Sequence, residues 1–221
     1  MSFSDAEVEC RERLTESLGL LNYLRISSPD DLSPLDDIQK ASRGLWLVSL
    51  YAALERSVNA IVDAGIREIS SHGTEHGRCV PPIHSILQFS YIQSVKDCKY
   101  EKALDQAVRL FESSMGTEVV FLADNPLSNY LKNVDGSTIS WICSLFGTDP
   151  YIFSASTVGK LKNLRERRNA VAHGRESASQ VGQRFNIEDL AALYSLVDEE
   201  VVRFRLHLAD YCSNRKYIRA A

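Results

Sequence analysis

The chain has 221 residues, of which 44% are hydrophobic and 24% are charged. These proportions are ordinary for a folded soluble protein, and the length suffices for one large domain or two small ones. No apolar run reaches the roughly 18 residues of a membrane-spanning helix, and the first residues lack the basic and apolar regions of a secretory signal. The five cysteines are an odd number and widely scattered, which favours reduced thiols over a disulfide framework. We therefore expect a cytoplasmic protein without a membrane partner.

The net charge of −4 conceals an uneven distribution along the chain. Residues 1–37 carry nine acidic and three basic side chains, whereas residues 160–175 carry one acidic and six basic side chains. A local excess of positive charge in an acidic protein indicates an anionic partner such as nucleic acid. Solvated helix faces explain the same distribution, and charge alone does not decide between the two.

Helical periodicity runs through the chain, and no segment shows sustained strand-type alternation. Ser4 and Glu7 match a capping box that opens the first helix. Ser33 as N-cap and Pro34 at the first helical position open a second helix that runs to about Ser70. The apolar stripe of this second helix comprises Leu47, Leu50, Leu54, Val58 and Ile61.

A loop with glycine and proline follows at residues 72–82. Shorter helices are predicted at residues 83–96, 101–115 and 137–146. A further helix begins near Ser156 and ends at Gly174, a residue suited to a helix C-terminus. Asn186 caps the last helix, whose apolar seam comprises Leu190, Leu193, Val197, Val201, Phe204, Leu208 and Tyr211. The pattern predicts one all-α helical bundle over residues 1–221.

The segment from Arg168 to Gly174 combines an arginine, Asn169 and His173 within a basic helix. Arginine supplies a fixed positive charge and histidine transfers protons near neutral pH, which are the two needs of phosphate chemistry. A histidine in the last turn of a helix is also explained by the helix dipole alone. At about 100° per residue, Arg168 and His173 diverge by about 140° on the helix.

Arg168 falls inside the apolar arc that Leu161, Leu164 and Val171 form on the same helical wheel. An arginine in this position needs a partner or a polar pocket. Glu55, at the shoulder of the apolar stripe of the second helix, is the candidate partner. Either the two form an ion pair that only stabilises the fold, or Glu55 orients Arg168 and leaves its guanidinium available to a phosphate.

The spacing of Arg168 and His173 resembles the Arg-x(4–6)-His motif of HEPN-domain proteins. The flanking helices, LVSLYAALERSVNAIV before it and FNIEDLAALYSLVDEEVVRF after it, are similar to those of the RiboL-PSP-HEPN type in prokaryotic defence and toxin loci. The resemblance covers about residues 40–70 and 156–215. Residues 75–150 look like an insertion.

This resemblance implies a HEPN-like bundle that forms a homodimer and acts as a metal-independent, cofactor-free endoribonuclease. By this analogy, Arg168 and His173 of both subunits line one composite cleft. The RNA 2′-hydroxyl attacks and leaves a 2′,3′-cyclic phosphate, with His173 in proton transfer and Arg168 stabilising charge. Asn169 and Glu55 complete the expected catalytic group. The expected RNA-binding residues are Lys162, Arg165, Arg167 and Arg175.

The resemblance also implies a toxin or antiphage effector with an antitoxin or defence-system partner. Some HEPN toxins carry a tyrosine two residues after the histidine, which a nucleotidyltransferase antitoxin modifies. Arg175 occupies that position here, so the residue for such regulation is absent.

Other functions remain open from the sequence. A non-catalytic HEPN module that binds RNA, a nucleotide or a protein is one, and a helical adaptor is another. Four potential zinc ligands share one loop, but their spacing matches no standard zinc motif, and no metal is expected; they are His72, His76, Cys79 and His84.

Overall fold

The computed structural model describes residues 2–27, 35–154 and 156–219. Within these ranges all regular elements are helices and no strand occurs, so the predicted all-α class is confirmed. The α-helices are α1 (Phe3–Ser27), α2 (Asp37–Ser71), α3 (His84–Leu87), α4 (Phe89–Asp97), α5 (Tyr100–Met115), α6 (Gly136–Phe146), α7 (Thr157–Ala172), α8 (Ala178–Gly182) and α9 (Ile187–Ser213). Three single-turn 3-10 helices are η1 (His76–Arg78), η2 (Pro81–Ile83) and η3 (Ser128–Tyr130).

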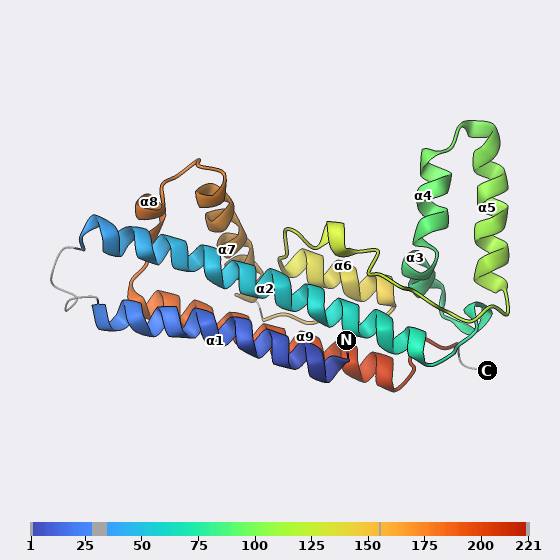
Figure 1. The fold of residues 1–221 in the computed structure, drawn as a ribbon, viewed down its shortest axis with the longest axis horizontal. Coiled ribbons are helices and arrows are strands. Elements are labelled where there is room, and N and C mark those ends of the chain that lie inside the picture. The colour runs from blue at the N-terminus through green and yellow to red at the C-terminus, as the bar shows by residue number, and fades with distance from the viewer. Residues whose placement is uncertain (1, 28–34, 155, 220–221) are drawn as a thin grey trace.

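Helices α1, α2 and α9 lie lengthwise against one another, while α7 and α8 cover another side of α2 (Figure 1). Helix α6 reaches α2 at its end, where Phe146 lies beside Gly65. The predicted stripe of α2 and seam of α9 are both buried in the core that joins these helices, as their spacing predicts. By length and composition α2 could cross a membrane, but 61% of its most apolar 18-residue stretch is buried inside the protein. The described part of the chain therefore has no clear membrane span.

The helix starts follow side-chain caps, with one correction. Asp36 and Gln39 form the capping box of α2, and Asn186 caps α9 as predicted. The first helix is instead capped by Ser2, whose hydroxyl accepts from the Asp5 amide at 3.2 Å. The predicted box at Ser4 and Glu7 is wrong because both residues already lie inside α1. The predicted cap at Ser33 and Pro34 lies outside the described residues.

Helices α4 and α5 form an antiparallel arm that projects from the bundle (Figure 1). No residue of either helix is fully buried. The predicted helix at residues 83–96 is divided into α3 and α4, since the chain leaves helical geometry at Gln88. After the arm the chain returns to the bundle, where Leu131 and Val134 are completely buried. The assignment of residues 75–150 as an insertion stays a prediction.

Two glycines let α8 lie with its backbone against α2. A methyl group added to Gly182 would overlap the carbonyl oxygen of Lys40, and one added to Gly44 would overlap that of Ala178. This contact fixes the turn from α8 to α9 with respect to α2.

Candidate active site

Helix α7 ends in a Schellman motif that presents His173 to solvent. Gly174 has a φ of 68° and donates its amide to the Val171 carbonyl at 3.1 Å, and the Arg175 amide reaches the Ala170 carbonyl at 2.9 Å. His173 is the C-cap residue directly before this turn, and its side chain is exposed. The predicted glycine stop of α7 is thus confirmed.

Arg168 lies at the junction of α7 and α2, where its guanidinium is held from several sides. Its Nη2 lies 2.5 Å from Oε2 of Glu55, so the predicted pair forms. The guanidinium carbon stands 4.3 Å from the centre of the Tyr51 ring, a cation–π contact. Nη1 donates to Oδ1 of Asn169 at 2.8 Å, and Nη2 also reaches the Lys132 carbonyl at 3.3 Å.

The pair is only partly buried, with 18% of the Arg168 side chain and 25% of the Glu55 side chain exposed. The three hydrogen bonds use three of the five N–H donors of a guanidinium, which leaves donors for an anion. Burial raises the pKa of Glu55, although the positive charges of Arg168 and Lys132 act in the opposite direction.

Residues 131–135, directly before α6, contact the residues around Arg168 and hold them in place. The sequence alone did not predict that this segment belongs to the site. The Tyr51 hydroxyl donates to the Val134 carbonyl at 3.0 Å, and the Asn133 side chain accepts from the Asn169 amide at 3.4 Å. Asp135 caps α6 and binds Arg165 of α7 at 2.5 Å. This segment therefore joins α2, α6 and α7 around Arg168.

Asp135 is buried, which raises the pKa of its carboxyl group, but its partners reverse that effect. The Ser137 hydroxyl and the Thr138 amide donate to Oδ1, and the Arg165 charge adds to them. The net result is a lowered pKa, so the carboxylate is ionised at neutral pH and holds Arg165 in place.

The predicted catalytic residues are only partly brought together within one chain. Glu55, Arg168 and Asn169 form one hydrogen-bonded group. His173 lies on another side of α7, and its imidazole has no hydrogen bond to any residue that the structure describes. The separation of Arg168 and His173 agrees with their calculated divergence on the wheel.

The four predicted RNA-binding residues fall into two groups. Arg165 binds Asp135, and Arg167 lies 3.6 Å from Glu176, so both have acidic partners. Lys162 and Arg175 are exposed and form no ion pair with the described part of the chain. An incoming phosphate would meet these last two without displacing a carboxylate.

The loop with three histidines and a cysteine gives no metal site among the described residues. The His72 ring lies 2.7 Å from the Tyr217 hydroxyl, and the His76 ring lies 3.1 Å from the Gln88 amide. Burial lowers the pKa of His76 and of His84, whose rings are stacked with centroids 6.3 Å apart. The five cysteines are all free.

Comparison with protein families gives a match to the RiboL-PSP-HEPN family model, which covers residues 9–210. The match spans most of the chain and includes all of α2 and α7 and most of α9. Comparison with curated proteins and with solved structures gives no significant match.

Proposed function

Since the chain belongs to the RiboL-PSP-HEPN family, we propose that it is an endoribonuclease whose reactive groups are Arg168 and His173. Family membership supports an RNA-related function. The observation that carries the proposal is the position of Arg168, whose guanidinium lies 2.5 Å from Glu55 while 18% of the side chain stays exposed. A purely structural ion pair does not need the two N–H donors that remain without a partner among the described residues.

In the proposed reaction, the ribose 2′-oxygen attacks the adjacent phosphorus and loses its proton to a base. The bond from phosphorus to the 5′-oxygen breaks, and that oxygen takes up a proton. The products are a 2′,3′-cyclic phosphate and a 5′-hydroxyl. His173 transfers protons, and Arg168 stabilises the charge that develops on the phosphoryl oxygens. Asn169 and Glu55 fix the guanidinium, and Lys162 and Arg175 hold flanking phosphates.

We propose that the working site is composite and forms in a homodimer. Arg168 and His173 diverge on α7 and have no contact within one chain, so a single subunit presents them in different directions. A second α7 across a two-fold axis would bring an Arg168 and a His173 to the same phosphate. A toxin or antiphage role in the cytoplasm, with an antitoxin or defence-system partner, is part of the same proposal.

Cleavage of total RNA in EDTA tests this function. Purified wild-type protein should cleave RNA without a divalent metal, and Arg168→Ala and His173→Ala should each lose the activity. A matched control is Lys102→Ala, in the exposed arm, which should cleave normally. Cleavage that persists in both active-site variants contradicts the residue assignment, and loss of cleavage in EDTA contradicts the metal-independent mechanism. If no RNA is cut but RNA binds, a non-catalytic HEPN module replaces the nuclease.

A further inference from the structure

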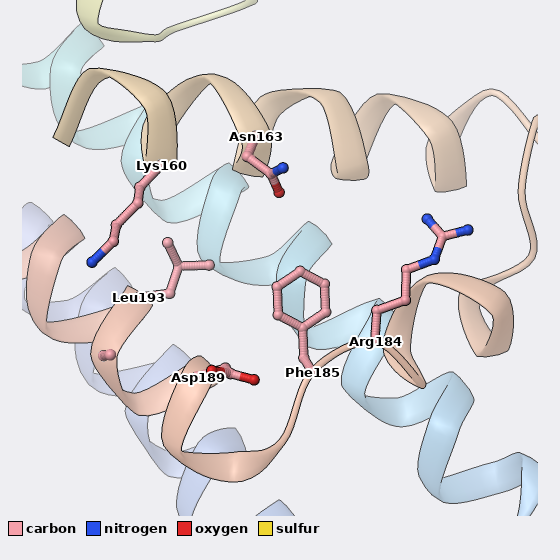
Figure 2. Close-up of a pocket in the computed structure, with 7 residues that line it drawn as sticks. Lys160, Asn163, Arg184, Phe185, Asp189 and Leu193 are labelled. Atoms are coloured by element: carbon pink, nitrogen blue, oxygen red, sulfur yellow. The ribbon is translucent and has the colours of Figure 1, made fainter. Parts of the chain in front are cut away.

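A pocket of about 350 Å³ lies between α7, the turn from α8 to α9, and the start of α9 (Figure 2). Among the described residues it shares no lining residue with the group formed by Glu55, Arg168 and Asn169. Its lining includes Lys160 and Asn163 of α7, Arg184 and Phe185 of the turn, and Asp189 and Leu193 of α9. The pocket therefore belongs to a surface distinct from the Arg168 site.

The lining combines an aromatic ring with two cations and an amide. The Phe185 ring points from the turn towards Asn163, with Lys160 on one side and Arg184 on the other (Figure 2). Aromatic rings stack on nucleobases of any sequence, an amide both donates to and accepts from base edges, and lysine and arginine bind phosphate. We propose that this pocket binds one ribonucleotide, with its base against Phe185 and its phosphate at Lys160.

Of the two cations at the pocket, Lys160 is the one that no acidic side chain in the described part of the chain pairs with. Arg184 forms an ion pair with Glu176, which fixes the position of its guanidinium. Asp189 accepts the Asn186 amide at 3.1 Å in the capping box of α9. Lys160 is exposed and has no acidic partner among the residues described. An anionic phosphate at Lys160 would supply the partner that this lysine lacks.

The pocket is formed before any ligand arrives. The Phe185 carbonyl accepts from Nη1 of Arg43 at 2.8 Å, which ties the turn to α2. The close contact of α8 with α2 at Gly44 and Gly182 holds the other end of the same turn. A preformed site loses little conformational entropy when it binds, so a small ligand can be retained by few contacts.

The choice of a ribonucleotide rests on the proposed RNA-related function, but binding at this pocket does not require cleavage. The nucleotide has two possible sources: one unit of an RNA strand that also passes Arg168, or a free nucleotide. Both would place a base on Phe185 and a phosphate at Lys160.

Calorimetric titration of the full chain tests the pocket. The ligands are the four nucleoside 5′-monophosphates and a short 2′-O-methyl oligoribonucleotide, which lacks the hydroxyl needed for the proposed cleavage. Lys160→Ala and Phe185→Leu should each weaken binding by about tenfold, the effect of one lost charged contact or stacking partner. Lys102→Ala should leave mononucleotide binding unchanged.

The outcomes separate the two sources and the two proposals. Weaker binding of the oligoribonucleotide in the pocket variants identifies an RNA strand as the occupant, and weaker binding of mononucleotides alone identifies a free nucleotide. No binding of any ligand, or equal binding by Lys160→Ala and wild type, overturns the proposal. Because Lys160 is exposed, its variant is informative even if Phe185→Leu does not fold. An inactive nuclease that still binds nucleotides through Lys160 would contradict the proposed function alone.

Discussion

Replacing Glu55 by glutamine separates the orienting role of this residue from a purely structural one. Glutamine keeps the size of the side chain and one acceptor oxygen, but removes the negative charge 2.5 Å from Arg168. Arg168 then keeps its contacts with Asn169, the Lys132 carbonyl and the Tyr51 ring. Its position becomes less restricted, while the core around it stays filled.

The expected change in stability is small because ionised Glu55 is not favoured by folding. Burial raises its pKa above the ordinary 4.5, so the folded state binds the proton more tightly than the unfolded state does. The stability of the wild type therefore falls as pH rises through the window above 4.5, and Glu55→Gln is free of this loss. At pH 7 we expect the free energy of unfolding to change by at most about 1 kcal/mol.

The expected change in cleavage is larger. Removal of a group that stabilises transition-state charge costs about 100- to 1000-fold in rate, which we expect for Arg168→Ala. Glu55→Gln leaves the guanidinium present but less well oriented, so the loss should be roughly 10- to 100-fold.

The assay combines urea unfolding at several pH values with the initial rate of RNA cleavage in EDTA. Asp63→Asn is the matched control, since Asp63 is also an acid of α2 but pairs with Arg67 outside the site. This control should cleave at the wild-type rate. A loss of more than about 3 kcal/mol in Glu55→Gln, with an unchanged rate per folded molecule, would refute the orienting role.

Three further predictions concern assembly and stability. Mixed subunits of Arg168→Ala and His173→Ala should recover part of the cleavage that each variant lacks, because a composite site then contains one intact Arg168 and one intact His173 from different subunits. No recovery of cleavage at any mixing ratio would contradict the shared site. Gly182→Ala should lower the free energy of unfolding by about 2–3 kcal/mol, because the added methyl overlaps α2. Gly159→Ala, with nothing within 4 Å of the added methyl, should raise it by about 0.5–1 kcal/mol. Both values are measured by chemical denaturation, and equal effects of the two substitutions would contradict the close contact of α8 with α2. Asp135→Asn keeps a side chain that can cap α6 but removes the negative charge that faces Arg165, so it should cost about 1–2 kcal/mol at pH 7. Because the folded pKa of Asp135 lies below 3.8, this difference should shrink as pH falls below that value. A difference independent of pH would show that the charge is not involved.

The sequence was sufficient for the long helices and for one tertiary contact. The apolar spacing in α2 and α9 persists over many turns, so their buried faces could be assigned without the structure. Arg168 inside an apolar arc required a partner, and Glu55 was an acid at the edge of the facing stripe. Burial of an unpaired charge is costly enough that this pairing could be inferred.

Local patterns with competing solutions were less informative. Ser2 with Asp5 and Ser4 with Glu7 both satisfy the capping-box spacing, and the chain uses the first. The role of residues 131–135 depends on the conformation of a loop and on its contacts with distant helices. The Tyr51 hydroxyl, for example, binds the carbonyl of Val134, which lies 83 residues away in the sequence. No periodicity predicts which loop carbonyl will meet a given side chain. The pocket beside Phe185 depends in the same way on the close approach of α8 to α2.

The nature of the RNA ends tests the central claim most directly. A defined RNA is incubated with the protein in EDTA, and the products are analysed by mass spectrometry beside a copy that carries 2′-deoxyribose at the cleaved position. The account predicts 2′,3′-cyclic phosphate and 5′-hydroxyl ends from the wild type, none from His173→Ala, and resistance of the deoxy copy. Cleavage of the deoxy copy, or 5′-phosphate ends, would contradict attack by the 2′-hydroxyl at a site made by Arg168 and His173.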